Sequence, residues 1–325
     1  MTTIKDVAKL SGFSPSAVSK YLINPDSVRD ATRRSIESAI NELGYTPSPV
    51  ARSLRTGKTG IVAVLVPEIT NPVFAELFSY IYEGCMGIGM TPVLHTIGGP
   101  DQLERVTAAV SPYHADGLIF CFLNEDVIEP LTQCAGGSAI INIGFNTDKR
   151  VSGSIVVDVA EGMRQVAGYL LSKQYRDIAY LGEPGGDTAS MKKIGGFLEG
   201  ISGRSVVRIL QGYRGLDMAH EATGLLLERG VPDAIVCETD ILAIGCLKRL
   251  AQERITVPDT VSVIGFDDIQ IAGMYEPPLT TVRLPLERIS KLSVEMLDDT
   301  MKGRKQDPVE VTPELVLRRS TKGAE

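Results

Sequence analysis

Hydrophobic side chains along this chain follow two different periods. In the first 45 residues they recur three and four positions apart, which is the spacing of amphipathic helices. From residue 60 onward, short runs rich in Val and Ile alternate with longer helical patterns. Near-continuous apolar strands separated by helices predict parallel sheets that helices cover on both faces. We therefore expect a small helical unit followed by an α/β body.

The apolar runs of the body form two sets, which predict two doubly wound parallel-sheet lobes. The strands expected in the first lobe are 61–66, 90–95, 117–122, 139–143 and 154–157, and those expected in the second lobe are 178–181, 206–210, 234–237 and 261–266. The last apolar segments, 280–283 and 309–318, are too short to form a domain of their own.

Capping residues mark the helix boundaries of the N-terminal unit. Thr3 can cap a first helix, and Gly12 ends it. Ser14 can cap a second helix whose first position is Pro15, where a missing N–H costs nothing. A third helix over Asp30–Leu43 completes a three-helix core. Two short helices joined by a tight, glycine-containing turn predict a helix-turn-helix.

The second helix has a free polar face that suits DNA. In a helix-turn-helix this helix enters the major groove with its N-terminal residues against base edges. The candidates here are Ser14, Pro15, Ser16, Ser19 and Lys20. Lys20 can donate to guanine O6 and N7, and Ser16 can contact a base edge or a phosphate. The helix N-terminus at Ser14 suits a phosphate oxygen, whereas Pro15 reads no hydrogen-bond pattern.

A further short helix is predicted within residues 48–56, and we call it the hinge helix. It has about eight residues, fewer than the ~12 to 15 that an isolated helix needs in water, so it should fray on its own. Arg52 and Arg55 suit phosphates, and Leu54 suits an apolar wedge between base steps in the minor groove. We expect the hinge helix to fold when two copies meet on DNA.

Several motifs carry a resemblance to a known family. They are IKDVA at 4–8, SPSAVSK at 14–20, ELGYTP at 42–47, ARSLRT at 51–56, NPVFAE at 71–76, VSVIGFDD at 261–268, PLTTV at 278–282 and RRST at 318–321. With these motifs the chain resembles the lactose-repressor (LacI/GalR) family of bacterial transcription regulators. The resemblance runs to the C-terminus and implies a periplasmic-binding-protein-like pair of lobes between which the last segments cross.

The resemblance also implies a division of the chain into four parts. These are a helix-turn-helix DNA-binding domain at 1–46, a hinge helix and linker at 47–59, an N-terminal effector lobe at 60–158 plus about 284–312, and a C-terminal effector lobe at 159–283 plus about 313–325.

Charge is distributed unevenly along the chain. Residues 1–60 hold nine Lys or Arg and five Asp or Glu, a net charge of +4. The whole chain carries −7, so the remaining residues carry −11. A basic head on an acidic body directs the head toward phosphate, although a small domain can reach +4 by chance.

Cysteine usage and the N-terminal segment set the expected environment. The five cysteines are an odd number without paired metal spacing, so we expect reduced residues of the core. Residues 1–6 contain no apolar signal segment, and no apolar run approaches the ~18 residues of a membrane span. We therefore expect a cytoplasmic protein with no membrane contact.

A ligand cleft is expected between the two lobes. Open parallel sheets bind ligands at the carboxyl ends of their strands, so two facing lobes form a cleft there. The candidates that follow strand ends are Asn71, Phe74, His95, Phe145, Asp158 and Asp267. A carboxylate and an amide beside an aromatic face suit a sugar. Phe74 and Phe145 could equally be core aromatics and Asp158 a helix cap, whereas the family's precedent favours Asp267 as a ligand contact.

The chain departs from the family's usual pattern at positions that are expected to contact the effector. Lys193 stands where the family usually has Arg, and it is a point charge without a bidentate fork. Thr239 and Val159 each stand where Asn is common. We count Lys193 and Thr239 among the effector-binding candidates. Together with Lys192 and Arg214, the departures favour an acidic or phosphorylated sugar, and solvated surface lysines are the alternative.

The predicted function is that of a homodimeric transcription regulator, a repressor of a carbohydrate-related operon. It would bind operator DNA under the control of a small-molecule effector held between the lobes. The alternatives are a constitutive DNA binder with a vestigial pocket, a sugar-processing enzyme with a DNA-binding head, and a sugar-binding transport protein. The transport protein would need an export signal and no DNA-binding head.

The enzyme alternative finds no supporting chemistry in the sequence. No glycine-rich loop stands between a strand and a helix to cradle phosphates, and the three histidines show no metal-ligand or nucleophile–base spacing. We therefore expect no catalytic residue, no metal and no cofactor.

Overall fold

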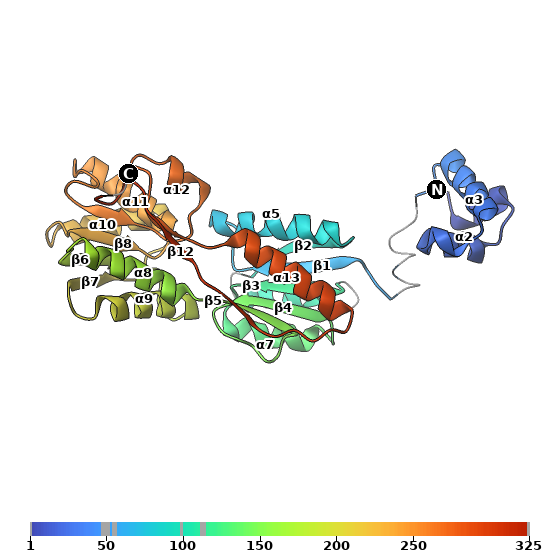
Figure 1. Ribbon diagram of the computed structural model, residues 1–325, viewed down its shortest axis with the longest axis horizontal. Coiled ribbons are helices and arrows are strands. Elements are labelled where there is room, and N and C mark those ends of the chain that lie inside the picture. Colours follow the sequence, from blue (N-terminus) through green and yellow to red (C-terminus); the bar gives the residue numbers. More distant parts are fainter. Residues whose placement is uncertain (1, 47–52, 54–56, 98–99, 111–114, 324–325) are drawn as a thin grey trace. The chain divides into compact units, whose positions relative to one another are not determined.

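The computed structural model describes residues 2–46, 53, 57–97, 100–110 and 115–323. Internal contacts divide the chain into two compact units, Met1–Gly60 and Ile61–Glu325, which we describe separately. Figure 1 shows the small helical unit at the N-terminal end of the sequence and the larger α/β unit that contains the C-terminus.

The N-terminal unit is a bundle of short helices. Its elements are α1 (Ile4–Ser11), α2 (Pro15–Ile23), the 3₁₀ turn η1 (Pro25–Ser27) and α3 (Asp30–Leu43). Val7, Val18 and Ile36 are fully buried at its centre, one from each α-helix. Gly12 ends α1 with a left-handed φ of 75°, a conformation that favours glycine. The predicted three-helix core and its boundaries are confirmed.

The first sheet of the larger unit is parallel and has six strands, in the order β11-β5-β4-β3-β1-β2. The strands are β1 (Ile61–Val66), β2 (Thr91–Thr96), β3 (Gly117–Cys121), β4 (Ala139–Gly144), β5 (Gly153–Val157) and β11 (Val309–Val311). Its helices are α5 (Pro72–Gly87), α6 (Pro100–Ala109), α7 (Glu125–Cys134) and α13 (Leu286–Met301).

Helices cover both faces of this sheet. Val62 and Val64 of β1 belong to the buried cluster that includes α5 and α13, whereas Ala63 and Leu65 belong to the cluster that includes α6 and α7. Since successive side chains of a strand point to opposite faces, every position of β1 can be apolar. This explains the continuous apolar run in the sequence. We call this sheet with its helices the first lobe.

The second sheet is also parallel, with the order β7-β6-β8-β9. The strands are β6 (Asp177–Leu181), β7 (Val206–Leu210), β8 (Ala234–Cys237) and β9 (Ser262–Ile264), and the helices are α8 (Val159–Ser172), α9 (Thr188–Ile201), α10 (Gly215–Leu227), α11 (Asp240–Gln252) and α12 (Gln270–Met274). In both lobes the second strand lies outside the first, and the third and fourth follow on the other side. The predicted fold class, two doubly wound lobes after a helix-turn-helix, is confirmed.

Over the residues that the structure describes, the chain passes between the lobes three times. It passes from β5 into α8, from β10 (Thr281–Arg283) into α13, and from β11 into β12 (Glu314–Val316). β10 and β12 pair antiparallel with each other, and we call them the crossing strands. Figure 1 shows the segments around β12 running between the two sheets.

The strand predictions over 117–122 and 261–266 were too long, the first by one residue because β3 ends at Cys121. We expected a strand over residues 261–266, but β9 ends at Ile264. The N–H of Gly265 donates to the carbonyl of Thr280 at 2.9 Å, and that of Asp267 donates to the carbonyl of Val282 at 2.9 Å. The end of the apolar run, at 265–267, therefore pairs with residues 280–282, which include the start of β10.

Cysteine burial follows the sequence prediction with one exception. Cys85, Cys121, Cys237 and Cys246 are buried free thiols, but Cys134 is exposed, so placing it in the core was wrong. Cys134 ends the amphipathic helix α7, whose inner face is formed by other residues. Among the described residues, no helix has the length and apolar content that crossing a bilayer requires.

Candidate functional site

The polar face of α2 is exposed in the N-terminal unit. Ser14, Pro15, Ser16 and Lys20 are exposed, and Ser19 is half-buried. The Ser14 hydroxyl accepts a hydrogen bond from the Ala17 N–H at 3.2 Å and so caps α2, as predicted. The five predicted DNA-contacting residues therefore stand at the cap and along the first turns of a helix that can enter a groove.

A polar network fixes the opposite side of α2. The Tyr21 hydroxyl donates to Glu37 Oε1 at 2.9 Å, and Arg33 Nε donates to the same oxygen at 3.3 Å. Arg33 also donates to Asp26 Oδ1 at 3.2 Å. The hydrogen bond from Tyr21 and the Arg33 guanidinium hold the pKa of Glu37 below its ordinary value. Sequence reasoning missed this network, although Arg33 and Glu37 stand four residues apart on one helix.

The hinge-helix predictions at Arg52, Leu54 and Arg55 lie outside the described residues.

A cavity of about 520 Å³ lies in the larger unit and is lined by both lobes. The first lobe contributes Pro67, Glu68, Asn71, Val73, Phe74, Ile97, Phe122, Leu123, Asn124, Asp126, Val127 and Phe145, and later segments contribute Val159, Glu183, Asp187, Ala189, Lys193, Arg214, Glu238, Thr239, Phe266, Asp267 and Leu284. Six of the eight predicted effector-binding residues are in this lining: Asn71, Phe74, Phe145, Lys193, Thr239 and Asp267.

Three aromatic rings form one wall of the cavity. The ring centres of Phe74 and Phe122 are 6.3 Å apart, and those of Phe122 and Phe145 are 5.3 Å apart. Phe74 lies in the first turn of α5, whereas Phe122 and Phe145 directly follow β3 and β4. The wall therefore forms at the carboxyl ends of parallel strands, where the fold predicts ligands. Sequence reasoning missed Phe122, which it assigned to the strand itself.

Asn71 and Asp267 bridge the two lobes across the cavity. Asn71 Oδ1 accepts from the Val73 N–H at 3.2 Å and caps α5, while its Nδ2 donates to Asp267 Oδ2 at 3.0 Å. Asp267 follows β9 and is only 6% exposed. Burial raises the pKa of Asp267, and the Lys193 ammonium and the Asn71 hydrogen bond oppose that rise.

Lys193 on α9 is buried against the backbone at the end of β8. Its Nζ donates to the Glu238 carbonyl at 2.9 Å and lies 4.0 Å from the centre of the Phe266 ring, a cation–π contact. The Glu238 carboxylate accepts from the Glu183 N–H at 2.9 Å and from the Ser190 hydroxyl. Sequence reasoning did not place Glu238 in the site. Thr239 lines the cavity while its hydroxyl oxygen caps α11.

Carboxylates outnumber cations in the described lining. Its acidic members are Glu68, Asp126, Glu183, Asp187, Glu238 and Asp267, and its basic members are Lys193 and Arg214. Arg214 lies 3.4 Å from a Glu183 carboxylate oxygen. Burial nevertheless raises the pKa of Glu183 to about 7. Lys192 is not in this lining; its Nζ donates to the Phe145 carbonyl of the other lobe.

Two predicted residues stand elsewhere. Asp158 caps α8 by accepting from the Glu161 N–H at 3.0 Å and lies 3.4 Å from Arg164, so the helix-cap alternative describes its place. His95 is partly buried on β2, and its burial lowers its pKa. β2 continues past His95 to Thr96, and Ile97, which follows the strand, lines the cavity whereas His95 does not.

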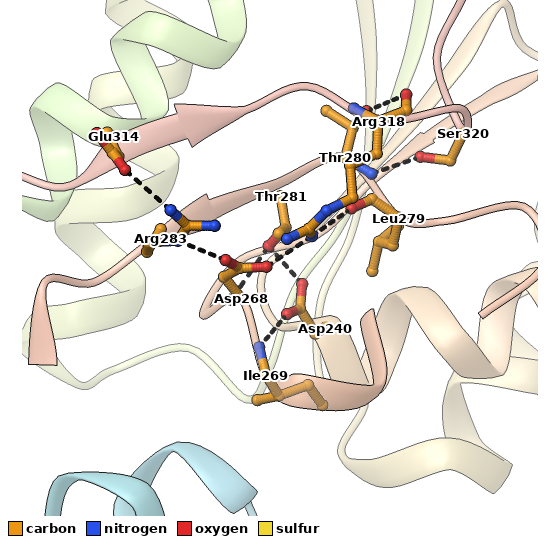
Figure 2. Close-up of polar contacts among 10 residues, drawn as sticks. All are labelled: Asp240, Asp268, Ile269, Leu279, Thr280, Thr281, Arg283, Glu314, Arg318 and Ser320. Carbon is orange, nitrogen blue, oxygen red and sulfur yellow. Dashed lines mark hydrogen bonds and ion pairs between the residues drawn. The ribbon is translucent and has the colours of Figure 1, made fainter. Parts of the chain in front are cut away.

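A polar cluster holds the turn that carries Asp267 (Figure 2). Asp240 is fully buried; it accepts from the Ile269 N–H at 2.9 Å and from the Thr281 hydroxyl at 2.5 Å. Burial and the nearby Asp267 raise the pKa of Asp240 well above its ordinary value. A Cβ at Gly265 would lie 2.1 Å from Asp240 Oδ1, so this position requires glycine. Within the described residues, no group of three or more side chains is suited to hold a metal ion.

Comparison with known proteins gives consistent matches for both units. The model of bacterial regulatory proteins of the lacI family matches residues 3–48, and that of the periplasmic binding protein-like domain matches residues 167–321. The HTH-type transcriptional repressor PurR of Vibrio parahaemolyticus is 32% identical, with 99% of each chain covered. A solved CelR–cellobiose complex is 25% identical with a TM-score of 0.73, covering 98% of this chain and all of that one. The lac repressor dimer bound to operator and the anti-inducer ONPF is 22% identical with a TM-score of 0.87, covering 98% of this chain and 99% of that one.

Proposed function

Because the chain belongs to the lacI family of bacterial regulatory proteins, we propose that it is a homodimeric transcriptional repressor whose operator binding is controlled by a small molecule in the cavity. This family consists of regulators, so the enzyme alternative is set aside. In this proposal the chain consists of a DNA-reading head at 1–46, a hinge at 47–59 and two effector lobes.

At the DNA end, we propose that Ser16, Ser19 and Lys20 contact base edges from α2. Ser16 and Lys20 are exposed and Ser19 is half-buried on a capped helix whose other face is buried, which supports this role. Arg52, Leu54 and Arg55 are proposed to bind phosphates and wedge the minor groove when the hinge helix folds. Lobe closure would change the spacing of two hinge helices and so their ability to fold on DNA.

At the effector end, we propose a neutral, hydroxyl-rich ligand such as a sugar. The observation that carries this is one cavity lined both by the buried carboxyl group of Asp267 and by three neighbouring aromatic rings. Hydroxyls donate to fixed carboxylates, and the C–H faces of a sugar ring pack on aromatic rings. The cellobiose found in the similar CelR structure is a ligand of this class.

The contacts of the cationic side chains argue against an acidic or phosphorylated sugar, which the sequence had favoured. Lys192 donates to a backbone carbonyl, Lys193 is held between a carbonyl and an aromatic ring, and Arg214 is paired with a carboxylate. The lining has six carboxyl groups against two cations, and those that are ionised would repel an anion in a partly buried cavity.

A thermal-shift assay on the full chain tests the effector class. We would compare ribose, glucose and cellobiose with gluconate and glucose 6-phosphate at equal concentration. We expect the unfolding midpoint to rise with at least one neutral sugar and not with the two anions, because a ligand that binds the folded state stabilises it. Asp267→Asn should abolish the rise, whereas Asp298→Asn, at an exposed ion pair on α13, should keep it.

Each other outcome would count against a stated part of the proposal. A rise with an anion alone would show that the proposed ligand class is wrong. If no sugar shifts the midpoint, while the chain still selects a two-fold symmetric site from random DNA, the vestigial-pocket alternative is favoured instead.

A further inference from the structure

The turn that follows β9 has an unusual backbone. Asp267 and Asp268 both have positive φ angles, 116° and 56°, which non-glycine residues rarely adopt. Such a conformation persists only when the surroundings hold it in place. Because Asp267 lines the cavity, the contacts that hold this turn also position a residue of the cavity.

Backbone hydrogen bonds join the turn to the first crossing strand. The N–H groups of Gly265 and Asp267 donate to the carbonyls of Thr280 and Val282, both at 2.9 Å. Asp240 then fixes the far side of the turn by accepting from the Ile269 N–H (Figure 2). Any movement of Asp267 must consequently be shared with β10 or break these bonds.

The Asp268 carboxylate lies between two arginines. Arg283 Nε donates to Asp268 Oδ2 at 2.6 Å, and Arg318 Nη1 lies 2.6 Å from Asp268 Oδ1 as an ion pair. The Asp268 side chain is only 7% exposed and that of Arg318 20%, whereas that of Arg283 is 46% exposed, so solvent screens the pair with Arg318 less than the pair with Arg283. Arg283 continues to Glu314 Oε1 at 3.3 Å, and Arg318 also donates to the Leu279 carbonyl at 2.9 Å.

Both arginines belong to chain segments that join the lobes. Arg283 ends β10, directly before the passage into α13 of the first lobe. Arg318 follows β12, which the chain enters from β11 of the first lobe. Asp268 therefore contacts two of the three passages between lobes, while its neighbour Asp267 contacts Asn71 of the first lobe across the cavity.

We propose that Asp268 is a positioning residue that couples the cavity to the crossing strands through Arg283 and Arg318. A change at Asp267 would pass to Asp268 through the shared turn and then alter both passages together, so that cavity occupancy biases the lobe arrangement. The inference rests on the proposed function of the cavity, but its test needs neither an effector nor DNA.

The test is a double-mutant cycle read by hydrogen–deuterium exchange on the full chain. Asn71→Ala removes the contact of Asp267 across the cavity, and Asp268→Asn removes the charge between the arginines without changing shape. In the wild-type background, we expect Asn71→Ala to raise exchange at least threefold in peptides covering 281–286 and 314–318. In the Asp268→Asn background, Asn71→Ala should add no further change there.

Controls separate coupling from general stability. Peptides covering β6, at the centre of the second sheet, should exchange alike in all variants, and Asp298→Asn in place of Asp268→Asn should leave the effect of Asn71→Ala intact. If Asp268→Asn does not fold, Arg283→Gln, at a half-exposed side chain, replaces it and should reduce the effect of Asn71→Ala.

Two results would overturn the proposal. One is an equal effect of Asn71→Ala with and without the charge at position 268, and the other is no effect of Asn71→Ala on the crossing peptides. Neither result concerns sugar binding, so failure of this inference is distinguishable from failure of the proposed function.

Discussion

Two adjacent glycines in α9 should respond in opposite ways to alanine. Gly195 is exposed, and a Cβ added there would meet no atom within 4 Å. Gly196 is buried, and a Cβ there would lie 2.3 Å from the carbonyl oxygen and 2.7 Å from the Cα of Ala160 in α8. The same substitution thus tests helix propensity at one position and close packing of α8 and α9 at the next.

These distances set the expected changes in the free energy of unfolding. In a helix interior alanine is favoured over glycine by about 1 kcal/mol, so Gly195→Ala should stabilise the protein by up to that amount. At Gly196 the clash is with backbone, which cannot rotate away, and an ordinary C···O contact of about 3.3 Å requires α8 to retreat by about 1 Å. Overpacking of this kind costs about 3 kcal/mol or more, which leaves a net loss of about 2 kcal/mol in Gly196→Ala.

Thermal unfolding followed by far-ultraviolet circular dichroism measures the difference. A gap of about 3 kcal/mol between the two variants corresponds to roughly 6 to 12 °C in the midpoint for a unit of this size. Gly195→Ala should unfold at or above the wild-type temperature and Gly196→Ala well below it. Equal midpoints for the two variants would refute the inferred close approach of α8 and α9.

Three further predictions concern Glu183, Lys20 and Leu54. Burial raises the pKa of Glu183 to about 7, so the folded protein holds a proton that the unfolded chain releases near pH 4.5; stability should fall by up to about 3 kcal/mol between these pH values. Glu183→Gln should reduce the change in stability between these pH values, measured by urea unfolding, and should be more stable than wild type at pH 8. An unchanged pH dependence of stability would contradict this. Lys20→Ala should relax base preference at one operator position by about 1 to 3 kcal/mol, measured by selection from random DNA, whereas a uniform loss over all sequences would indicate a phosphate contact. Leu54→Ala should weaken operator binding by a few kcal/mol in a gel-shift titration while sparing sugar-induced thermal shifts, and unchanged operator affinity would exclude the wedge.

The fold class and the position of most elements could be predicted from the amino-acid sequence. Helical periodicity with caps at Ser14 and Gly12 marked the N-terminal helices, because capping chemistry depends on residues close in sequence. Continuous apolar runs marked the buried parallel strands for the same local reason. Side chains that follow a strand, such as Asn71 and Asp267, could be placed near the cavity because parallel strands end at one edge of a sheet.

Which of those side chains share the cavity depends on contacts between segments that are distant in the sequence. Asp158 also follows a strand and His95 was expected to end one, but β2 continues to Thr96 and Asp158 caps α8. The carboxylate excess, the burial of Lys193 and the contact of Asp268 with two arginines each depend on residues far apart in the chain. The same holds for Gly195 and Gly196, which look alike in the sequence, because packing between distant segments is set by the fold and leaves no local pattern.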